Sequence, residues 1–76
     1  MNYLITGASG GIGKEIFKEI YTNQDKFFLF YNKKKIISHK SNVLSFKVDF
    51  KNLNQLEKKI KKILTKIKNF DYIINC

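Results

Sequence analysis

The sequence predicts an α/β fold in which an open parallel sheet carries helices on both faces. Three observations predict it: apolar segments of strand length alternate with helical patterns, one of these segments is apolar throughout, and a glycine-rich turn joins the first strand to the first helix. Parallel strands need crossover connections, and their right-handed winding covers both faces of the sheet. A chain of 76 residues is long enough for one small domain.

Four apolar segments are predicted to be strands, at residues 2–6, 27–31, 43–48 and 72–75. The second segment, FFLFY, shows no polar alternation, which is typical of a strand covered on both faces. The third alternates more and is expected nearer an edge of the sheet. The segment 32–42 is polar except for two isoleucines and fits either a short helix or an irregular crossover.

Apolar residues at helical spacing predict two helices, from about residue 11 to 23 and from about residue 53 to 68. Their apolar faces comprise Ile12, Ile16, Phe17, Ile20 and Tyr21 in the first helix and Leu56, Ile60, Ile63, Leu64 and Ile67 in the second. Asn52 stands where the second helix needs an N-cap residue, and Gln55 three positions later resembles the far end of a capping box.

Composition excludes several classes of protein. The single cysteine, Cys76, excludes an internal disulfide framework and a cysteine-based zinc site. No apolar run approaches the roughly 18 residues of a membrane span, and the N-terminus lacks the pattern of a signal peptide, so a cytoplasmic location is expected. His39 has no acidic residue near it and no second histidine, so neither metal binding nor catalysis is expected of it.

The chain is strongly basic, with 15 lysines against 6 acidic residues and a net charge of +9. Residues 51–68 alone carry seven lysines and one glutamate, and such a helix can lie on a membrane or a nucleic acid. The same pattern is typical of a surface helix in a lysine-rich protein, which we favour. Affinity from net charge alone would be weak and salt-dependent, so neither a specific nucleic acid nor a membrane is expected as a partner.

The glycine-rich turn at residues 6–13, TGASGGIG, directly follows a strand and opens a helix, which is the context of a phosphate-binding turn. Gly7 lets the chain leave the strand at positive φ. Gly11 removes a Cβ where a pyrophosphate approaches, Gly13 permits close packing of helix on strand, and Ser9 could donate its hydroxyl. The unpaired N–H groups of the first helical turn then face the phosphates. An ordinary tight turn and a mononucleotide site remain alternatives, whereas a Walker-type loop is excluded because no Gly-Lys-Ser/Thr ends this one.

Three motifs resemble those of the short-chain dehydrogenase/reductase family. TGASGGIG is similar to the family's TGxxxGxG fingerprint and also fits the TGxxGxxG spacing of its extended branch. VDF at residues 48–50 resembles the Asp-hydrophobic pair after the third strand, and DYIINC at 71–76 resembles the D-hydrophobic-NNAG strand of the compact, single-domain branch. The resemblance covers residues 2–76, and the nearest relatives look like 3-oxoacyl-[acyl-carrier-protein] reductases and kindred carbonyl reductases.

This resemblance implies the N-terminal half of a Rossmann doubly wound sheet with strand order 3-2-1-4, a single partial NAD(P)-binding domain over residues 1–76 that ends after the fourth strand. It implies that the cofactor's pyrophosphate and adenosine ribose are held by the turn. The residues that correspond to that turn are Gly7, Ala8, Ser9, Gly10, Gly11, Ile12 and Gly13.

Four further positions correspond to family contacts with the adenosine half. Asp49 matches the residue that hydrogen-bonds the adenine amino group, and Phe50 matches the neighbour whose backbone meets the adenine ring. Asn75 keeps the first Asn of the NNAG pattern, whereas Cys76 replaces the second and falls where the family touches the adenosine ribose. The alternatives are an Asx-type cap for Asp49 and a plain end-of-strand role for Cys76.

The end of the second strand favours NADP as the cofactor, with NAD as the alternative. An acidic residue there would bind the ribose 2′-hydroxyl and repel a 2′-phosphate. The sequence instead has Asn32 followed by three lysines, of which Lys33 is the first, and we expect these two residues to contact the phosphate. A solvated loop is the alternative explanation of the lysines, and Gly10 stands where NADP-preferring relatives often carry a basic residue.

The family's catalytic Ser and its Tyr-x-x-x-Lys pair lie well beyond the region that the resemblance covers. In the family the Tyr acts as general acid on the carbonyl, while the Lys lowers its pKa and holds the nicotinamide ribose. The present chain is therefore expected to be either the cofactor-binding part of an oxidoreductase or a truncated, inert fragment with at most weak nucleotide binding. The substrate is not predicted, and a full-length form could be a homo-oligomer.

Overall fold

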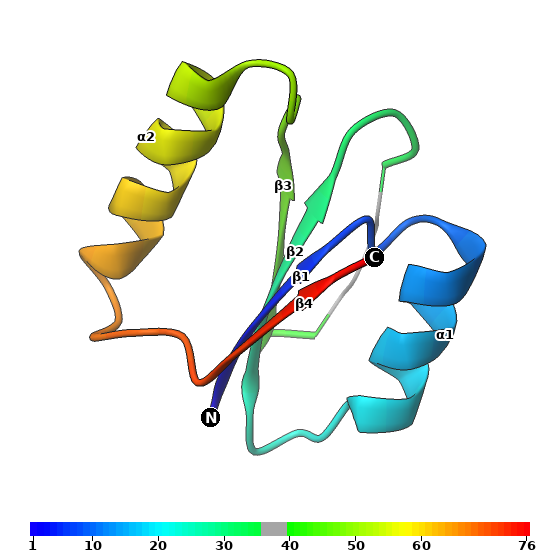
Figure 1. The fold of residues 1–76 in the computed structure, drawn as a ribbon. Coiled ribbons are helices and arrows are strands. Elements are labelled where there is room, and N and C mark those ends of the chain that lie inside the picture. Colours follow the sequence, from blue (N-terminus) through cyan, green and yellow to red (C-terminus); the bar gives the residue numbers. More distant parts are fainter. Residues whose placement is uncertain (36–39) are drawn as a thin grey trace.

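The computed structural model describes residues 1–35 and 40–76, and their strands are all parallel (Figure 1). The strands are β1 (Asn2–Thr6), β2 (Lys26–Tyr31), β3 (Val43–Lys47) and β4 (Tyr72–Asn75), and they form one sheet in the order β3-β2-β1-β4. Helices α1 (Gly11–Ile20) and α2 (Leu53–Leu64) lie on opposite faces of this sheet. The predicted α/β class and strand order are confirmed.

Strand β2 supplies side chains to both faces of the sheet. Its residues 27–30 are all buried, as the uninterrupted apolar run predicts. Successive side chains of a strand point to opposite faces, so Phe28 and Phe30 enter the core beneath α2, whereas Phe27 and Leu29 enter the core beneath α1. Each such buried side chain stabilises the fold by roughly 1.5–3 kcal/mol. Strand β3 is an edge strand, in agreement with its more alternating pattern.

The other edge of the sheet, β4, exposes apolar side chains on both faces. Tyr72 is 50% exposed and Ile73 is 65% exposed. On the α1 face the ring of Tyr72 stacks on Tyr3 at a centroid distance of 5.1 Å. An edge strand presents unpaired backbone groups, and β4 carries no charged residue that would discourage another strand from pairing with it.

Helix α2 begins at the residue that its sequence predicts and with the predicted cap. The side-chain Oδ1 of Asn52 accepts a hydrogen bond from the backbone N–H of Gln55 at 3.1 Å. In a capping box the Gln55 side chain would accept from Asn52 in return. Here Gln55 Oε1 instead accepts from the backbone N–H of Asp49 at 3.0 Å, so the cap also holds the chain that leaves β3.

Both helices end earlier than the periodicity predicts. Helix α1 ends at Ile20 because Tyr21 takes an extended backbone with φ −60° and ψ 131°. Helix α2 ends at Leu64, where the Thr65 hydroxyl donates to a carbonyl oxygen of the last turn at 2.6 Å. Tyr21 and Ile67 still pack against the cores from outside the helices, which is why the apolar pattern overstates the helical lengths.

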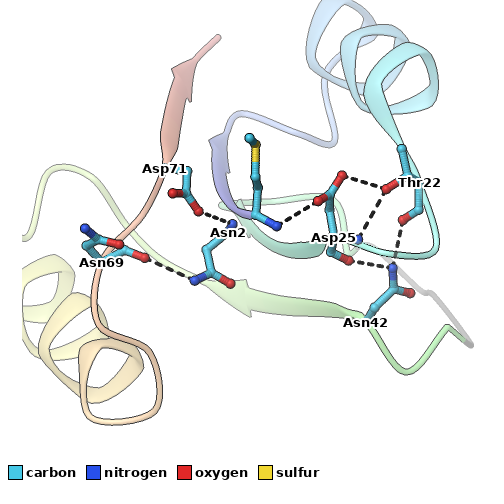
Figure 2. Close-up of polar contacts among 7 residues, drawn as sticks. Asn2, Thr22, Asp25, Asn42, Asn69 and Asp71 are labelled. Carbon is cyan, nitrogen blue, oxygen red and sulfur yellow. Dashed lines mark hydrogen bonds and ion pairs between the residues drawn. The ribbon is translucent and has the colours of Figure 1, made fainter.

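The amino end of the sheet is closed by polar contacts (Figure 2). The Asp25 carboxylate accepts hydrogen bonds from the N-terminal ammonium group at 2.7 Å and from the Thr22 hydroxyl at 2.6 Å. These hydrogen bonds lower the pKa of the Asp25 carboxyl, the first contributing most. The Asn42 amide, at the start of β3, donates to the carbonyl oxygens of Thr22 and Asp25 at 3.0 and 2.8 Å.

A second group of contacts joins β4 to the first residues of the chain at the same end. The backbone N–H of Asn2 donates to Asp71 Oδ2 at 2.7 Å, and the Asp71 N–H donates to the Asn2 carbonyl at 2.8 Å. The Asn2 side chain also donates to the Asn69 carbonyl at 3.2 Å. Residues more than sixty positions apart in the sequence are thus fixed to one another where the strands begin.

Candidate functional site

The turn between β1 and α1 needs glycine at the two positions where the chain is most crowded. Gly7 has φ +65°, the left-handed conformation that the sequence predicts. A Cβ at Gly7 would lie 2.7 Å from the carbonyl oxygen of Cys76, and a Cβ at Gly13 would collide with the backbone of Gly7. Gly11 is different, because a Cβ there would meet no heavy atom within 4 Å. That position therefore borders open space and not packed protein.

The first turn of α1 presents backbone donors to this open space. The N-cap residue is Gly10, which has no side chain to accept from these N–H groups, and the first turn holds no acidic residue. Within the described residues, the N–H groups of residues 11–13 donate to no protein acceptor. Unpaired N–H groups and the positive end of the helix dipole together favour an anion. The Ile12 side chain, which the sequence groups with the apolar face of the helix, is 74% exposed, because it lies in the first turn, beyond the edge of the α1 core.

A pocket of about 400 Å³ opens beside the turn, at the carboxyl end of the sheet. It is formed by the ends of β1 and β4, the first residues after β2, and the loop after β3. Its lining residues are Thr6, Gly7, Ser9, Gly10, Asn32, Lys33, Lys34, Phe50, Asn75 and Cys76. Eight of them are among the thirteen cofactor-binding residues that the sequence predicts, all except Thr6 and Lys34. Ligands of open α/β sheets bind outside the carboxyl ends of the strands, which is where this pocket lies.

The charged residues that line the pocket are both cations, Lys33 and Lys34. They follow directly after Asn32, where the chain leaves β2, and all three residues are exposed. The pocket is thus lined by Gly10, the N-cap of α1, and by these two lysines. A helix N-terminus and cations both favour an anionic ligand.

The family can be assigned from a sequence model. A model of the short chain dehydrogenase family matches residues 2–76. The chain belongs to the short-chain dehydrogenase family. The family that the three sequence motifs predict is thereby confirmed, while the closer likeness to 3-oxoacyl-[acyl-carrier-protein] reductases stays a prediction.

Two solved structures share the fold. One is a short chain dehydrogenase family protein from Francisella tularensis subsp. tularensis SCHU S4, with 22% identity and a TM-score of 0.78 over 99% of this chain and 30% of that one. The other is a double mutant of a Serratia marcescens short-chain dehydrogenase/reductase, with 21% identity and a TM-score of 0.77 over 99% of this chain and 34% of that one. The present chain thus spans about a third of their length. Among curated proteins no significant match is found.

Five of the predicted site residues do not line the pocket. Ala8 and Gly13 are buried beneath the turn, while Gly11 and Ile12 are exposed in the first turn of α1. Asp49 is exposed, and its Oδ1 accepts a hydrogen bond from the backbone N–H two residues later at 3.0 Å. This is the Asx-type cap that the sequence offers as the alternative for Asp49, and its contact with adenine stays a prediction.

Sequence reasoning does not single out two of the lining residues, Thr6 and Lys34. Thr6 is the first residue of the TG motif, and its hydroxyl donates to Asn75 Oδ1 at 2.6 Å. Lys34 continues the run of cations that begins at Lys33. The TG motif and the run of lysines could have pointed to these two residues. The contact of Thr6 with Asn75, however, follows only from the parallel register of β1 and β4.

One Tyr-x-x-x-Lys string does occur in this chain, at Tyr31 to Lys35. A spacing of four residues brings two side chains into contact in a helix, one turn apart. Here Tyr31 is the last residue of β2, and the three residues that follow it are bends. The string therefore lies at the edge of the pocket and does not form the family's catalytic pair.

No group of three or more metal-ligating side chains occurs within residues 1–35 and 40–76. In the same part of the chain, neither helix is long and apolar enough to cross a membrane. His39, from which no metal binding or catalysis is expected, lies outside the described residues, as does the middle of the 32–42 connection.

Proposed function

We propose that residues 1–76 are the NADP(H)-binding N-terminal part of a short-chain reductase that reduces a carbonyl by hydride transfer. The observation that carries the proposal is a set of N–H groups, those of residues 11–13, that have no acceptor among the described residues and lie beside a pocket that two lysines line. Family membership supports a dinucleotide as the ligand, because dinucleotide binding is what this glycine-rich turn serves in the family.

The donor set of the pocket fits the adenosine half of such a cofactor. The backbone N–H groups at the start of α1 would hold the pyrophosphate, and the open space at Gly11 admits its approach. Phe50 offers an apolar surface, 37% exposed, for the adenine ring. Asn32, Lys33 and Cys76 lie around the remaining wall, where the adenosine ribose and its 2′-phosphate would be held.

The lysines favour NADPH over NADH. A 2′-phosphate adds close to two negative charges at neutral pH, and no acidic side chain lines the pocket. An exposed ion pair contributes up to about 1 kcal/mol, so Lys33 and Lys34 together would favour NADPH by roughly tenfold.

The residues of this chain would hold and orient the adenosine end of NADPH, and the cofactor, when bound, would supply the hydride. In the family, the Ser and the Tyr-x-x-x-Lys pair lie beyond the region that corresponds to residues 1–76. The proton donor to the carbonyl and the substrate pocket would therefore come from a further segment of a longer protein. The alternative is an inert fragment with at most weak nucleotide binding.

Calorimetric titration with NADPH, NADH and adenosine 2′,5′-bisphosphate tests the proposal. We expect NADPH to bind more tightly than NADH, and the bisphosphate to bind nearly as tightly as NADPH, since the lining residues serve the adenosine half. Failure of all three nucleotides to bind would contradict the proposal. Equal binding of NADH and NADPH would contradict the choice of cofactor alone, and binding of polynucleotide without any nucleotide affinity would favour a small basic module instead.

A further inference from the structure

We propose that the α-amino group of Met1 is a modification-sensitive site, at which an acyl group destabilises the amino end of the sheet. The inference is independent of the nucleotide site, because the candidate pocket lies at the carboxyl end of the strands. It rests on an ion pair that joins the amino group of Met1 to Asp25, in the turn between α1 and β2 (Figure 2).

This ion pair is short and partly shielded from water. The Met1 ammonium nitrogen lies 2.7 Å from Asp25 Oδ1, and the Asp25 side chain is only 20% exposed. A hydrogen bond between two charged groups is stronger than one between neutral groups. Within the described residues no lysine forms an ion pair with Asp25, although the chain contains fifteen lysines. The ammonium group is therefore the cation that holds this carboxylate in place.

The same carboxylate organises the turn that leads into β2. Asp25 Oδ2 accepts a hydrogen bond from the Thr22 hydroxyl at 2.6 Å, and the oxygen of that hydroxyl accepts from the Asp25 backbone N–H at 3.2 Å. The carbonyl oxygens of both residues accept from the Asn42 amide. The turn is thus held to the start of β3 on one side and to the ammonium group on the other.

The first residues of the chain also connect β1 to both of its neighbours. The Met1 carbonyl oxygen accepts from the backbone N–H of Lys26 at 2.8 Å, at the start of β2. The next residue, Asn2, exchanges hydrogen bonds with Asp71, just before β4. A change at the Met1 nitrogen therefore acts where three strands begin. Met1 itself is 62% exposed, so a small group on its nitrogen has room.

Acylation removes the charge that Asp25 binds. When an acetyl thioester acylates the neutral amine, the N–C bond forms, the C–S bond breaks and the thiolate leaves with the proton of the amine. The product is an amide without charge, and it carries one N–H donor where the ammonium group carries three. The Asp25 carboxylate then loses its cation, while its hydrogen bond with Thr22 remains. An acetyl group is small, so we expect the loss of charge and not the added bulk to determine the effect.

A double-mutant cycle tests the inference, with the acetyl group as one change and Asp25→Asn as the other. Chains with a free and with an acetylated amino group, identified by mass spectrometry, are unfolded by heat. We expect acetylation to lower the melting temperature by a few degrees in the unsubstituted protein and to have little effect in Asp25→Asn. Asp71→Asn is the matched control: Asp71 accepts from a backbone N–H, so the effect of acetylation should persist in that variant.

A pH titration followed by NMR separates the effect of charge from that of shape. Hydrogen bonds from the ammonium group and then from Thr22 lower the pKa of the Asp25 carboxyl, and Tyr3 lies near it. Tyr3 also lies near Tyr72 and Asp71, and acetylation alters none of these side chains. In the acetylated chain the pKa of the Asp25 carboxyl should therefore rise toward its ordinary value of 3.8.

Three results would overturn the inference. They are equal melting temperatures of the free and acetylated chains, an equal loss on acetylation in Asp25→Asn, and an Asp25 pKa that acetylation leaves unchanged. None of these measurements uses a nucleotide, so they decide the inference separately from the proposed function.

Discussion

The two ends of the sheet use their polar groups in opposite ways. At the amino end, the side chains of Asp25, Asn42 and Asp71 find partners within the protein (Figure 2). At the carboxyl end, the N–H groups of residues 11–13 and the Asn75 amino group find none within the described residues. The same kinds of group thus stabilise the fold at one end and remain available at the other.

This difference follows from the geometry of a parallel sheet. All strands end on one side, and each connection there leaves the sheet in a different direction, so a crevice forms outside the strand ends. Some of the polar groups that face it, such as the Thr6 hydroxyl, are satisfied by a neighbouring strand, whereas the N–H groups at the start of α1 are not. The comparison teaches that binding capacity in this chain is located where the fold leaves hydrogen-bonding groups unpaired.

The largest expected effect is on stability, and it distinguishes Gly13, which is tightly packed, from Gly11, which borders open space. Gly13→Val places a side chain against the backbone of Gly7, and we expect it to destabilise the protein by about 3 kcal/mol or more. The matched variant Gly11→Ala meets no heavy atom within 4 Å, so its stability should not fall, whereas its NADPH affinity should. Chemical denaturation and calorimetry measure the two quantities. A stable Gly13→Val variant would show that the turn is not as tightly packed as described.

The second-largest expected effect is on cofactor preference, when the two lysines that line the pocket are replaced. The double variant Lys33→Ala/Lys34→Ala should lose most of the NADPH preference, roughly tenfold at low salt, with NADH affinity nearly unchanged. The melting temperature without nucleotide should stay the same, because both side chains are exposed. Lys61→Ala on α2, outside the pocket, is the control and should leave the preference intact. Equal losses for both nucleotides would place the 2′-phosphate elsewhere.

The smallest expected effect belongs to the amino end. Hydrogen bonds from the N-terminal ammonium group and Thr22 lower the pKa of Asp25 from its ordinary value of 3.8. A lowered pKa contributes stability that is present above the ordinary value and is lost as the pH falls through the folded value. Asp25→Asn should therefore lower the melting temperature near neutral pH and flatten its acid-side fall. Nucleotide affinity should not change, and a change there would mean that the two ends are coupled.

Much of the fold could be predicted from local pattern. The buried run in β2, the periodicity of the helices and the glycine-rich turn each reflect interactions between near neighbours in the sequence. The ends of the helices could not be predicted, because Tyr21 and Ile67 pack as apolar residues outside a helix. The exposure of Ile12 was missed for a related reason: periodicity does not reveal where the sheet beneath a helix ends.

The site residues that belong to a local motif could be predicted from the sequence. The contacts that depend on the register of neighbouring strands could not. The glycine positions, Asn32 and Lys33 follow from local sequence. The contact between Thr6 and Asn75 joins residues 69 positions apart, and the network around Asp25 likewise depends on which strands are neighbours. Asp49 differs from these residues, because its contact is local in the sequence. Its Oδ1 accepts a hydrogen bond from the backbone N–H two residues later.

The central claim is that the start of α1 and the surrounding strand ends bind a dinucleotide while the amino end of the sheet does not. Titration of the ¹⁵N-labelled protein with NADPH, followed by two-dimensional NMR, tests it most directly. We predict that the amide signals of residues 7–13 shift most, together with those of Lys33 and Asn75, while those of Asp25, Asn42 and Asp71 stay in place. Shifts confined to the amino end or to the lysines of α2, or the absence of any shift, would contradict the account.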